Sequence, residues 1–154
     1  MRQEVFAEYV QASVVGYAEE NIASGRWAAE GAVERSASEF RDLLPQGLAT
    51  QKNHLFEIKV DDQGPTIGFI WFAEEDRHGA RGAFVYDVVV KEDFRRQGHA
   101  ERAFLALEPL VAALGLSSIG LHVFGHNEAA QALYAKLGYA VTGINMLKKL
   151  SVRA

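Results

Sequence analysis

The stretch FRRQGHAERAF, at positions 94–104, combines the residue types that bind a phosphate group, and it follows a short apolar run, FVYDVVV. The first turn of a helix offers unpaired backbone N–H groups and a partial positive charge, which together stabilise an anion. Gly98 and Ala100 would let a phosphate approach that backbone closely, because neither carries a bulky side chain. Arg95 and Arg96 add local positive charge. The stretch therefore predicts a pyrophosphate site at the start of a helix.

Two common pyrophosphate motifs are excluded. No GK[ST] follows the glycine, so the segment is not a P-loop, and G-x-G-x-x-G is absent, so it is not the dinucleotide fingerprint. These residues alone leave open which carrier of a pyrophosphate binds. A dinucleotide or a nucleotide sugar held in another way stays an alternative.

Together with a second segment, the chain resembles the GCN5-related N-acetyltransferases, whose acyl-CoA signature is [Q/R]-x-x-G-x-[G/A] after a central strand. Arg95, Gly98 and Ala100 match that signature. The segment NEAAQALYAKLGYAVTG, at 127–143, is similar to the later motif of the family, an asparagine before a helix that carries a tyrosine and ends in Gly-aromatic. The matching residues are Asn127, Ala130, Tyr134, Gly138 and Tyr139. The resemblance is specific over about 83–147, and residues 1–50 match it only in helical character.

This resemblance implies an α/β acyl-CoA N-acyltransferase fold, with a mixed central sheet, two parallel strands that splay apart and an N-terminal helical hairpin. In relatives the pantetheine arm of acetyl-CoA inserts between the splayed strands, and Val88, Val89 and Val90 match the positions whose backbone pairs with that arm. The remaining residues implied at the acetyl-CoA site are Arg95, Arg96, Gln97, Gly98, His99 and Ala100, around the pyrophosphate, and Asn127, Ala130 and Tyr134 from the later motif.

The resemblance also implies catalytic roles. Tyr134 matches the usual acid of the family, and a phenol with a reference pKa of about 10 is protonated at neutral pH and can donate to a departing thiolate. Some relatives carry a glutamate base five residues before the asparagine. Here that position is His122, whose imidazole could take a proton at neutral pH, and Asp87 on the adjacent strand could orient it or act through water. The alternatives are packing roles for Tyr134 and His122, with ordered water as the base.

Periodic apolar residues predict two helices before the sheet. They recur at helical spacing from Val5 to Tyr17, and the glycine of SGRW would end that helix. A second helical pattern runs from Val33 to Leu44 and is broken by Pro45. The strand that usually opens the fold is not evident, because the chain begins almost directly in the helix.

The period then changes to that of strands. The segment 55–60 and TIGFIWFAEE, joined by DDQGP, predict an antiparallel hairpin, and AFVYDVVV, apolar on both faces, predicts a central strand. The later elements expected are a helix over 100–114, a strand over 117–124, a helix from Asn127 to Gly138, and one or two closing strands over 139–150. Because a strand, a crossover helix and a strand form a right-handed unit, the strands near 84–90 and 118–124 should run parallel, with ligands at their carboxyl ends.

Composition bounds the function further. The 154 residues are 49% hydrophobic and 23% charged, which indicates a single domain over 1–154. The absence of cysteine excludes disulfides and thiol catalysis and fits a reducing compartment, so we expect a cytoplasmic protein without a membrane segment. A net charge of −4 argues against nucleic-acid binding. His122 and His126 lack a third ligand at useful spacing, so no metal is expected.

The function expected from the sequence is transfer of an acetyl group from acetyl-CoA, as cosubstrate, to a primary amine by direct attack. The acceptor could be a small molecule or a protein amine. A non-catalytic acyl-CoA-binding module is the alternative. A homodimer through the closing strands is compatible with the pattern.

Overall fold

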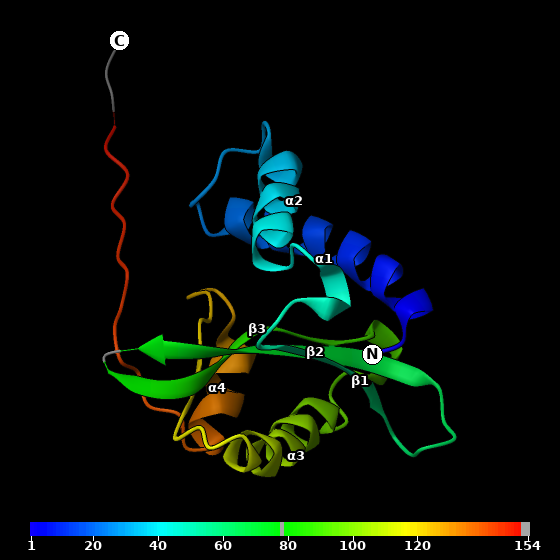
Figure 1. Cartoon of the computed structure of the whole chain (residues 1–154). Helices are drawn as coiled ribbons and strands as arrows, with labels where there is room; N and C mark the ends of the chain where they lie inside the picture. The colour runs from blue at the N-terminus through cyan, green and yellow to red at the C-terminus, as the bar shows by residue number, and fades with distance from the viewer. Residues whose placement is uncertain (78, 152–154) are drawn as a thin grey trace.

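In the part of the chain that the structure describes, four strands form one sheet, and helices cover both of its faces (Figure 1). The computed structural model describes residues 1–77 and 79–151. Its elements are α1 (Gln3–Ala23), α2 (Ala32–Leu43), a 3-10 turn at Gly47–Ala49, β1 (Asn53–Lys59), β2 (Thr66–Arg77), β3 (Ala80–Val90), a 3-10 turn at Glu92–Phe94, α3 (His99–Ala113), β4 (Ile119–Leu121) and α4 (Glu128–Lys136). The strand order is β1-β2-β3-β4, antiparallel except for the parallel pair β3 and β4. The α/β fold class with a mixed sheet is confirmed.

Strand β2 separates two apolar cores, because its side chains alternate between the faces of the sheet. Phe69 and Trp71 belong to the core under α1 and α2, where the Tyr9 ring lies 5.0 Å from that of Phe69. Ile70 and Phe72 belong to the core under α3. The side chains of both cores are buried. The predicted helical hairpin is present as α1 and α2, and the predicted β-hairpin is present as β1 and β2, so both predictions are confirmed. No helix within the described ranges is both long and apolar enough to cross a bilayer.

The parallel pairing of β3 and β4 is short. It joins Ala83–Val85 to Ile119–Leu121 and goes no further. The predicted parallel arrangement is confirmed, but β4 is shorter than the predicted strand over 117–124, so His122 lies just beyond the strand. A segment remains a strand only while a neighbour supplies its hydrogen bonds, and β3 no longer pairs with β4 after Val85.

A β-bulge in β3 lies where this pairing ends. Trp71 pairs with Asp87 and Phe72 pairs with Val85, so Tyr86 is an extra residue on β3. Tyr86 stacks on Trp71, at 4.9 Å between ring centroids, on the side of α1. Asp87 faces the same side as Tyr86. Val85 and Val88, which precede and follow these two residues, both pack under α3. Regular alternation would have placed Asp87 with Val85, so the bulge turns its carboxylate toward α1.

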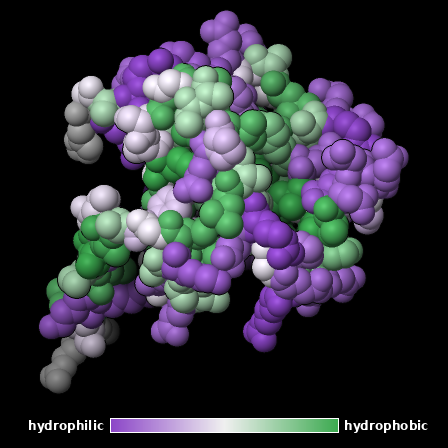
Figure 2. All heavy atoms as spheres, turned by 90° about the horizontal axis from the view of Figure 1, so that it is seen from below, coloured by the Kyte–Doolittle hydropathy of each residue, from purple (hydrophilic) through white to green (hydrophobic). Residues whose placement is uncertain are grey.

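The C-terminal segment corrects one prediction. Residues 139–151 contain neither helix nor strand, so the prediction of one or two closing strands over 139–150 is wrong. We call residues 139–151 the tail. It runs from α4 beyond the level of α2 (Figure 1), and its apolar side chains are between 71% and 89% exposed at Val141, Ile144, Met146, Leu147 and Leu150. Figure 2, seen from the side of α3 and α4, shows hydrophobic residues on the body of the molecule and on a projecting segment. The sequence pattern indicates a strand-forming segment, but it cannot supply the neighbour with which a strand must pair.

Candidate active site

A cleft of about 3040 Å³ opens where β3 and β4 separate. Most of the residues expected at the site line it: Asp87, Val88, Val89, Val90, Arg95, Arg96, Gly98, His99, Ala100, His122, Asn127, Ala130 and Tyr134. Gln97 does not, because its side-chain amide turns back and donates to the Asp93 carbonyl at 3.3 Å. The topology therefore brings together residues from β3, α3, α4 and the end of β4.

One edge of β3 faces this cleft. Val88, Val89 and Val90 pair with β2 on their other edge, opposite Ile70, Phe69 and Gly68. A Cβ on Gly68 would collide with the Val89 carbonyl oxygen, so a larger residue cannot take this position without moving β3. Because β4 has already ended, the backbone groups on the second edge of this segment point into the cleft.

The start of α3 forms the second wall. Gly98 is the N-cap residue and has φ +79°, a left-handed conformation that glycine adopts without strain. The helix begins with His99, so the backbone N–H groups of its first turn have no partner inside the helix. The Arg95 Nε donates to the Val90 carbonyl at 2.8 Å, which joins the loop to the end of β3.

Arg102 lies beside the start of α3, although it does not line the cleft, and the sequence prediction did not name it. Its guanidinium donates to the Gln97 carbonyl at 2.9 Å and lies 2.8 Å from the His99 Nδ1. A Cβ built on Gly98 would lie 2.8 Å from the Arg102 Nη1, which places this charge over the helix start. Arg102 could have been found from the sequence, because it lies four residues after Gly98 and therefore one helical turn away, on the same face.

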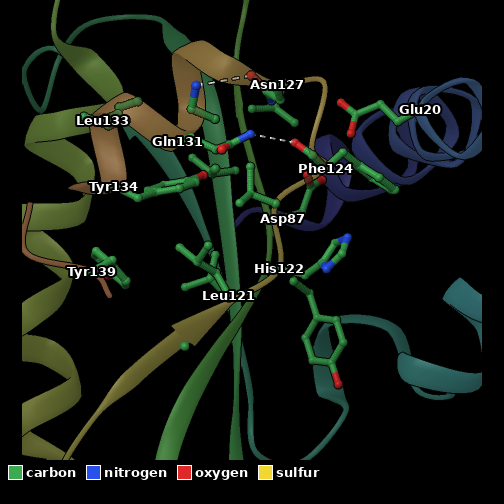
Figure 3. A pocket seen from close by; sticks show the side chains of 18 of the residues that line it. Glu20, Asp87, Leu121, His122, Phe124, Asn127, Gln131, Leu133, Tyr134 and Tyr139 are labelled. Atoms are coloured by element: carbon green, nitrogen blue, oxygen red, sulfur yellow. Dashed lines mark hydrogen bonds between the residues drawn. The ribbon is translucent and has the colours of Figure 1, made fainter. Parts of the chain in front are cut away.

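Tyr134 projects from α4 into the cleft (Figure 3). Its ring packs edge-on against Phe104, with centroids 5.3 Å apart, and lies 5.7 Å from the ring of Tyr139. Burial raises the pKa of Tyr134 to about 12, and the nearby Tyr139, Asp87 and Glu20 add to that increase. The phenol is therefore protonated at neutral pH and able to donate a proton.

Asp87 has a different partner from the one expected. Its Oδ2 accepts a hydrogen bond from the Tyr9 hydroxyl at 2.8 Å, and within the described part of the chain no hydrogen bond joins it to His122. The structure shows no direct contact for the orientation of His122 by Asp87, because the bulge directs the carboxylate to α1, and a role of Asp87 through water stays a prediction. Burial raises the pKa of Asp87, although the hydrogen bond from Tyr9 acts in the opposite direction. Burial likewise raises the pKa of Tyr9 well above its ordinary value.

His122 lies on the far side of the same space. Its ring packs edge-on against Phe124 at 4.9 Å between centroids. Figure 3 shows His122, Asp87, Glu20 and Tyr134 arranged around one opening from four different elements. An imidazole, two carboxylates and a phenol there could exchange protons with a bound amine.

The turn after β4 is held by α4. The Asn127 Oδ1 accepts from the Ala130 N–H at 3.2 Å and caps the helix, as its position in the sequence predicted. The Gln131 amide donates to the carbonyls of Phe124 and Gly125, at 3.3 and 3.0 Å. Gln131 was not predicted as a site residue, although its place one turn after the cap was a usable signal.

Comparison with known proteins agrees with this geometry. The family model described as acetyltransferase (GNAT) family matches residues 12–139. The uncharacterized N-acetyltransferase YycN of Bacillus subtilis (strain 168) is 37% identical over 150 residues, which cover 97% of this chain and 96% of that protein. A crystal structure of YycN aligns with a TM-score of 0.93 at 36% identity, over 99% of this chain and 96% of that one. A structure of AAC(6')-Iy, at 16% identity, shares the fold with a TM-score of 0.56 over 77% of this chain and 80% of that one.

The parted strands beside a glycine-capped helix start define an α/β acyltransferase architecture. The chain belongs to the GNAT acetyltransferase family, because the family model spans most of its length and YycN aligns with nearly all of it. The resemblance found in the sequence is thus confirmed.

Proposed function

We propose that residues 1–154 form one catalytic domain that transfers an acetyl group from acetyl-CoA to a primary amine. The amine attacks the thioester directly, and no covalent intermediate forms on the enzyme. The observation that carries the proposal is that β3 and β4 part next to the start of α3, so that a strand edge and a helix N-terminus share one cleft. The acetyltransferase family of the chain supports it.

The residues at the cleft suit acetyl-CoA. Its pyrophosphate fits the N-terminal turn of α3, where Gly98 carries no side chain and Arg95 and Arg96, which line the cleft, supply positive charge. Its pantetheine amides fit the free edge of β3 at Val88–Val90, in the manner of an added strand. The AAC(6')-Iy structure is a complex with the bisubstrate analog CoA-S-monomethyl-acetylneamine. At 16% identity that likeness concerns the fold, so the use of CoA here is part of the proposal.

Two proton transfers accompany the reaction, and different residues around the opening carry out each of them. The thioester supplies an activated acetyl carbonyl, to which the amine nitrogen bonds as the carbon–sulfur bond breaks. Tyr134 donates its hydroxyl proton to the departing sulfur, and its high pKa keeps that proton in place beforehand. His122, or a water molecule beside it, takes the proton that the amine releases. A backbone N–H of Val88–Val90 polarises the carbonyl, and a donor of this kind contributes about 3 to 4 kcal/mol to transition-state stabilisation.

The acceptor side of the cleft favours a cationic amine. Glu20 and Asp87 place two carboxyl groups near His122, with Phe124 beside them (Figure 3). The acceptor is then a small amine or an amine on a protein, held by these charges before it loses a proton. The cytoplasmic location expected from the sequence stays a prediction.

Thiol release tests the proposal. The chain contains no cysteine, so a thiol reagent reports only the coenzyme A set free from acetyl-CoA. With a panel of amines, the wild type should release thiol, and Tyr134→Phe should lower kcat by about 10²- to 10⁴-fold while it still binds acetyl-CoA. Binding of acetyl-CoA without thiol release for any amine would instead favour the non-catalytic acyl-CoA module. A thermal shift with NAD or ATP, but none with acetyl-CoA, would overturn the assignment of the carrier.

A further inference from the structure

Arg26, in the loop between α1 and α2, lines the cleft on the side where the acceptor is expected. Its Nη1 donates to the Tyr17 hydroxyl at 3.3 Å, and the Tyr17 ring lies 6.5 Å from that of Phe124 between centroids. Phe124 in turn packs edge-on against His122. Two aromatic rings, both of which line the cleft, therefore connect Arg26 with the imidazole.

A buried side chain holds this guanidinium in place. Asn21 is 0% exposed, and its Oδ1 accepts from the Arg26 Nη1 at 3.1 Å, while its Nδ2 donates to the Tyr17 carbonyl at 2.8 Å. The Asn21 carbonyl accepts from the backbone N–H groups of Arg26 and Trp27, at 3.0 and 3.1 Å. An arginine loses much side-chain entropy when a ligand fixes it. Because Asn21 already fixes Arg26, a ligand would find this cation preorganised.

The groups that hold the guanidinium are neutral. Tyr17 and Asn21 contribute uncharged oxygen atoms, and the Trp27 ring centroid lies 5.8 Å from the Arg26 Cζ. Among residues 1–77 and 79–151, no carboxylate oxygen lies within 4.0 Å of the Arg26 guanidinium, and its Nε and Nη2 make no hydrogen bond. The positive charge is therefore not neutralised, and the planar guanidinium suits the oxygen atoms of a carboxylate or a phosphate.

The charges around Arg26 set it apart from its neighbours. Among the described residues 1–50 that line the cleft, Arg26 is the only cationic side chain, whereas Glu20 and Glu39 are acidic. Arg35 also lies over the Trp27 ring, with its Cζ 5.2 Å from the centroid, but Arg35 does not line the cleft. Packing on Trp27 is thus available to either arginine, and only Arg26 is directed to the space that a ligand would occupy.

We propose that Arg26 binds an anionic group of the acceptor, so that the acceptor is an amine that also carries a carboxylate or a phosphate. The amine lies near Glu20 and Asp87 (Figure 3), its anionic group pairs with Arg26, and the rings of Tyr17 and Phe124 contact the part between them. Arg26 determines specificity and takes no part in the proton transfers. This inference rests on the proposed acetyl transfer and adds to it the class of acceptor.

Thiol release from acetyl-CoA with paired amines tests this subsite in the full chain. γ-Aminobutyrate and its amide differ only in the negative charge, ε-aminocaproate and its amide form a longer pair, and phosphoethanolamine and ethanolamine supply the phosphate. For at least one pair, kcat/KM should be about 10- to 100-fold higher for the anionic member, because it gains a charge-assisted hydrogen bond. The pair with the preference distinguishes a carboxylate from a phosphate.

Substitution of each arginine over Trp27 then assigns the preference to one side chain. Arg26→Gln should bring the kcat/KM values of the two members together, and Arg26→Lys should retain part of the preference, because lysine has the charge without the planar fork. Arg35→Gln is the matched control and should keep the preference of the wild type. The ratio of two substrates in one variant does not depend on the fraction of folded enzyme, so it reports specificity rather than stability.

Three results would overturn the subsite while acetyl transfer stands: a wild type that releases thiol without preference in any pair, a preference that persists in Arg26→Gln, or one that is lost equally in Arg35→Gln. No thiol release with any amine would instead contradict the proposed function, and this inference with it.

Discussion

The two ends of α3 allow a matched test of phosphate binding. Gly98 precedes the helix with φ +79°, and Gly115 follows it with φ +77°. Alanine at either position must adopt a left-handed conformation, which costs roughly 1–2 kcal/mol. In a chain of about 150 residues, each kcal/mol lowers Tm by about 2–4 °C. Gly98→Ala and Gly115→Ala should therefore reduce Tm by similar amounts.

Only the first variant should weaken acetyl-CoA binding. The new methyl group at residue 98 would stand where the pyrophosphate approaches the backbone and would meet the Arg102 guanidinium, 2.8 Å away. Apart from its neighbours along the chain, no heavy atom of residues 1–77 and 79–151 lies within 4 Å of a Cβ at Gly115. Loss of one charge-assisted hydrogen bond costs about 1.5–3 kcal/mol, which corresponds to a roughly 10- to 150-fold increase in Kd.

Isothermal titration of each variant with acetyl-CoA, at a temperature well below both melting transitions, measures this difference directly. Equal Kd values for Gly98→Ala and the wild type would refute a pyrophosphate site at the start of α3. A weaker Kd for Gly115→Ala as well would show that general destabilisation, rather than a local contact, causes the loss.

Three further predictions concern the opposite side of the cleft. His122→Gln should abolish the part of the pH dependence of kcat/KM that an imidazole produces, and an unshifted profile would leave water as the base. Because burial raises the pKa of Asp87, its contribution to stability is full below the unfolded pKa of about 4 and decreases as pH rises through the folded value. Asp87→Asn keeps an acceptor for Tyr9, so urea unfolding should show less loss of stability from pH 4 to 7 than in the wild type, and an unchanged loss would contradict this assignment. Asn127→Ala removes the cap of α4 and should cost about 1 kcal/mol in urea unfolding, with Gln131→Ala as a comparison that leaves the cap in place.

The sequence predicted the local elements well because their signals are local. The helix over 3–23, the hairpin of β1 and β2 and the Asn127 cap each follow from periodicity or from one residue in a fixed place. Gly98 was predicted only to leave the backbone open to a phosphate, and its positive φ is a finding of the structure.

The partners of Asp87 and of the tail could not be predicted in this way. Tyr9 lies 78 residues before Asp87, and no periodic pattern links a helix residue to a strand residue so distant. The bulge that brings them together is a matter of register between two strands, and the apolar pattern of β3 is compatible with either register. The tail pattern likewise indicates a strand without saying which neighbour it pairs with.

Because Tyr86 is an extra residue in β3, the number of residues between Val85 and Val88 determines which face of the sheet each following side chain reaches. Val85 and Val88 both pack in the core under α3, with two residues between them. In a regular strand, two side chains on the same face have one residue between them. We expect deletion of either Tyr86 or Asp87 to restore the ordinary ladder and to let β3 continue alongside β4 beyond Leu121, which would narrow the cleft between the two strands. A change of length at this short stretch is therefore expected to alter the cleft, in addition to any effect on the side chains of Tyr86 and Asp87.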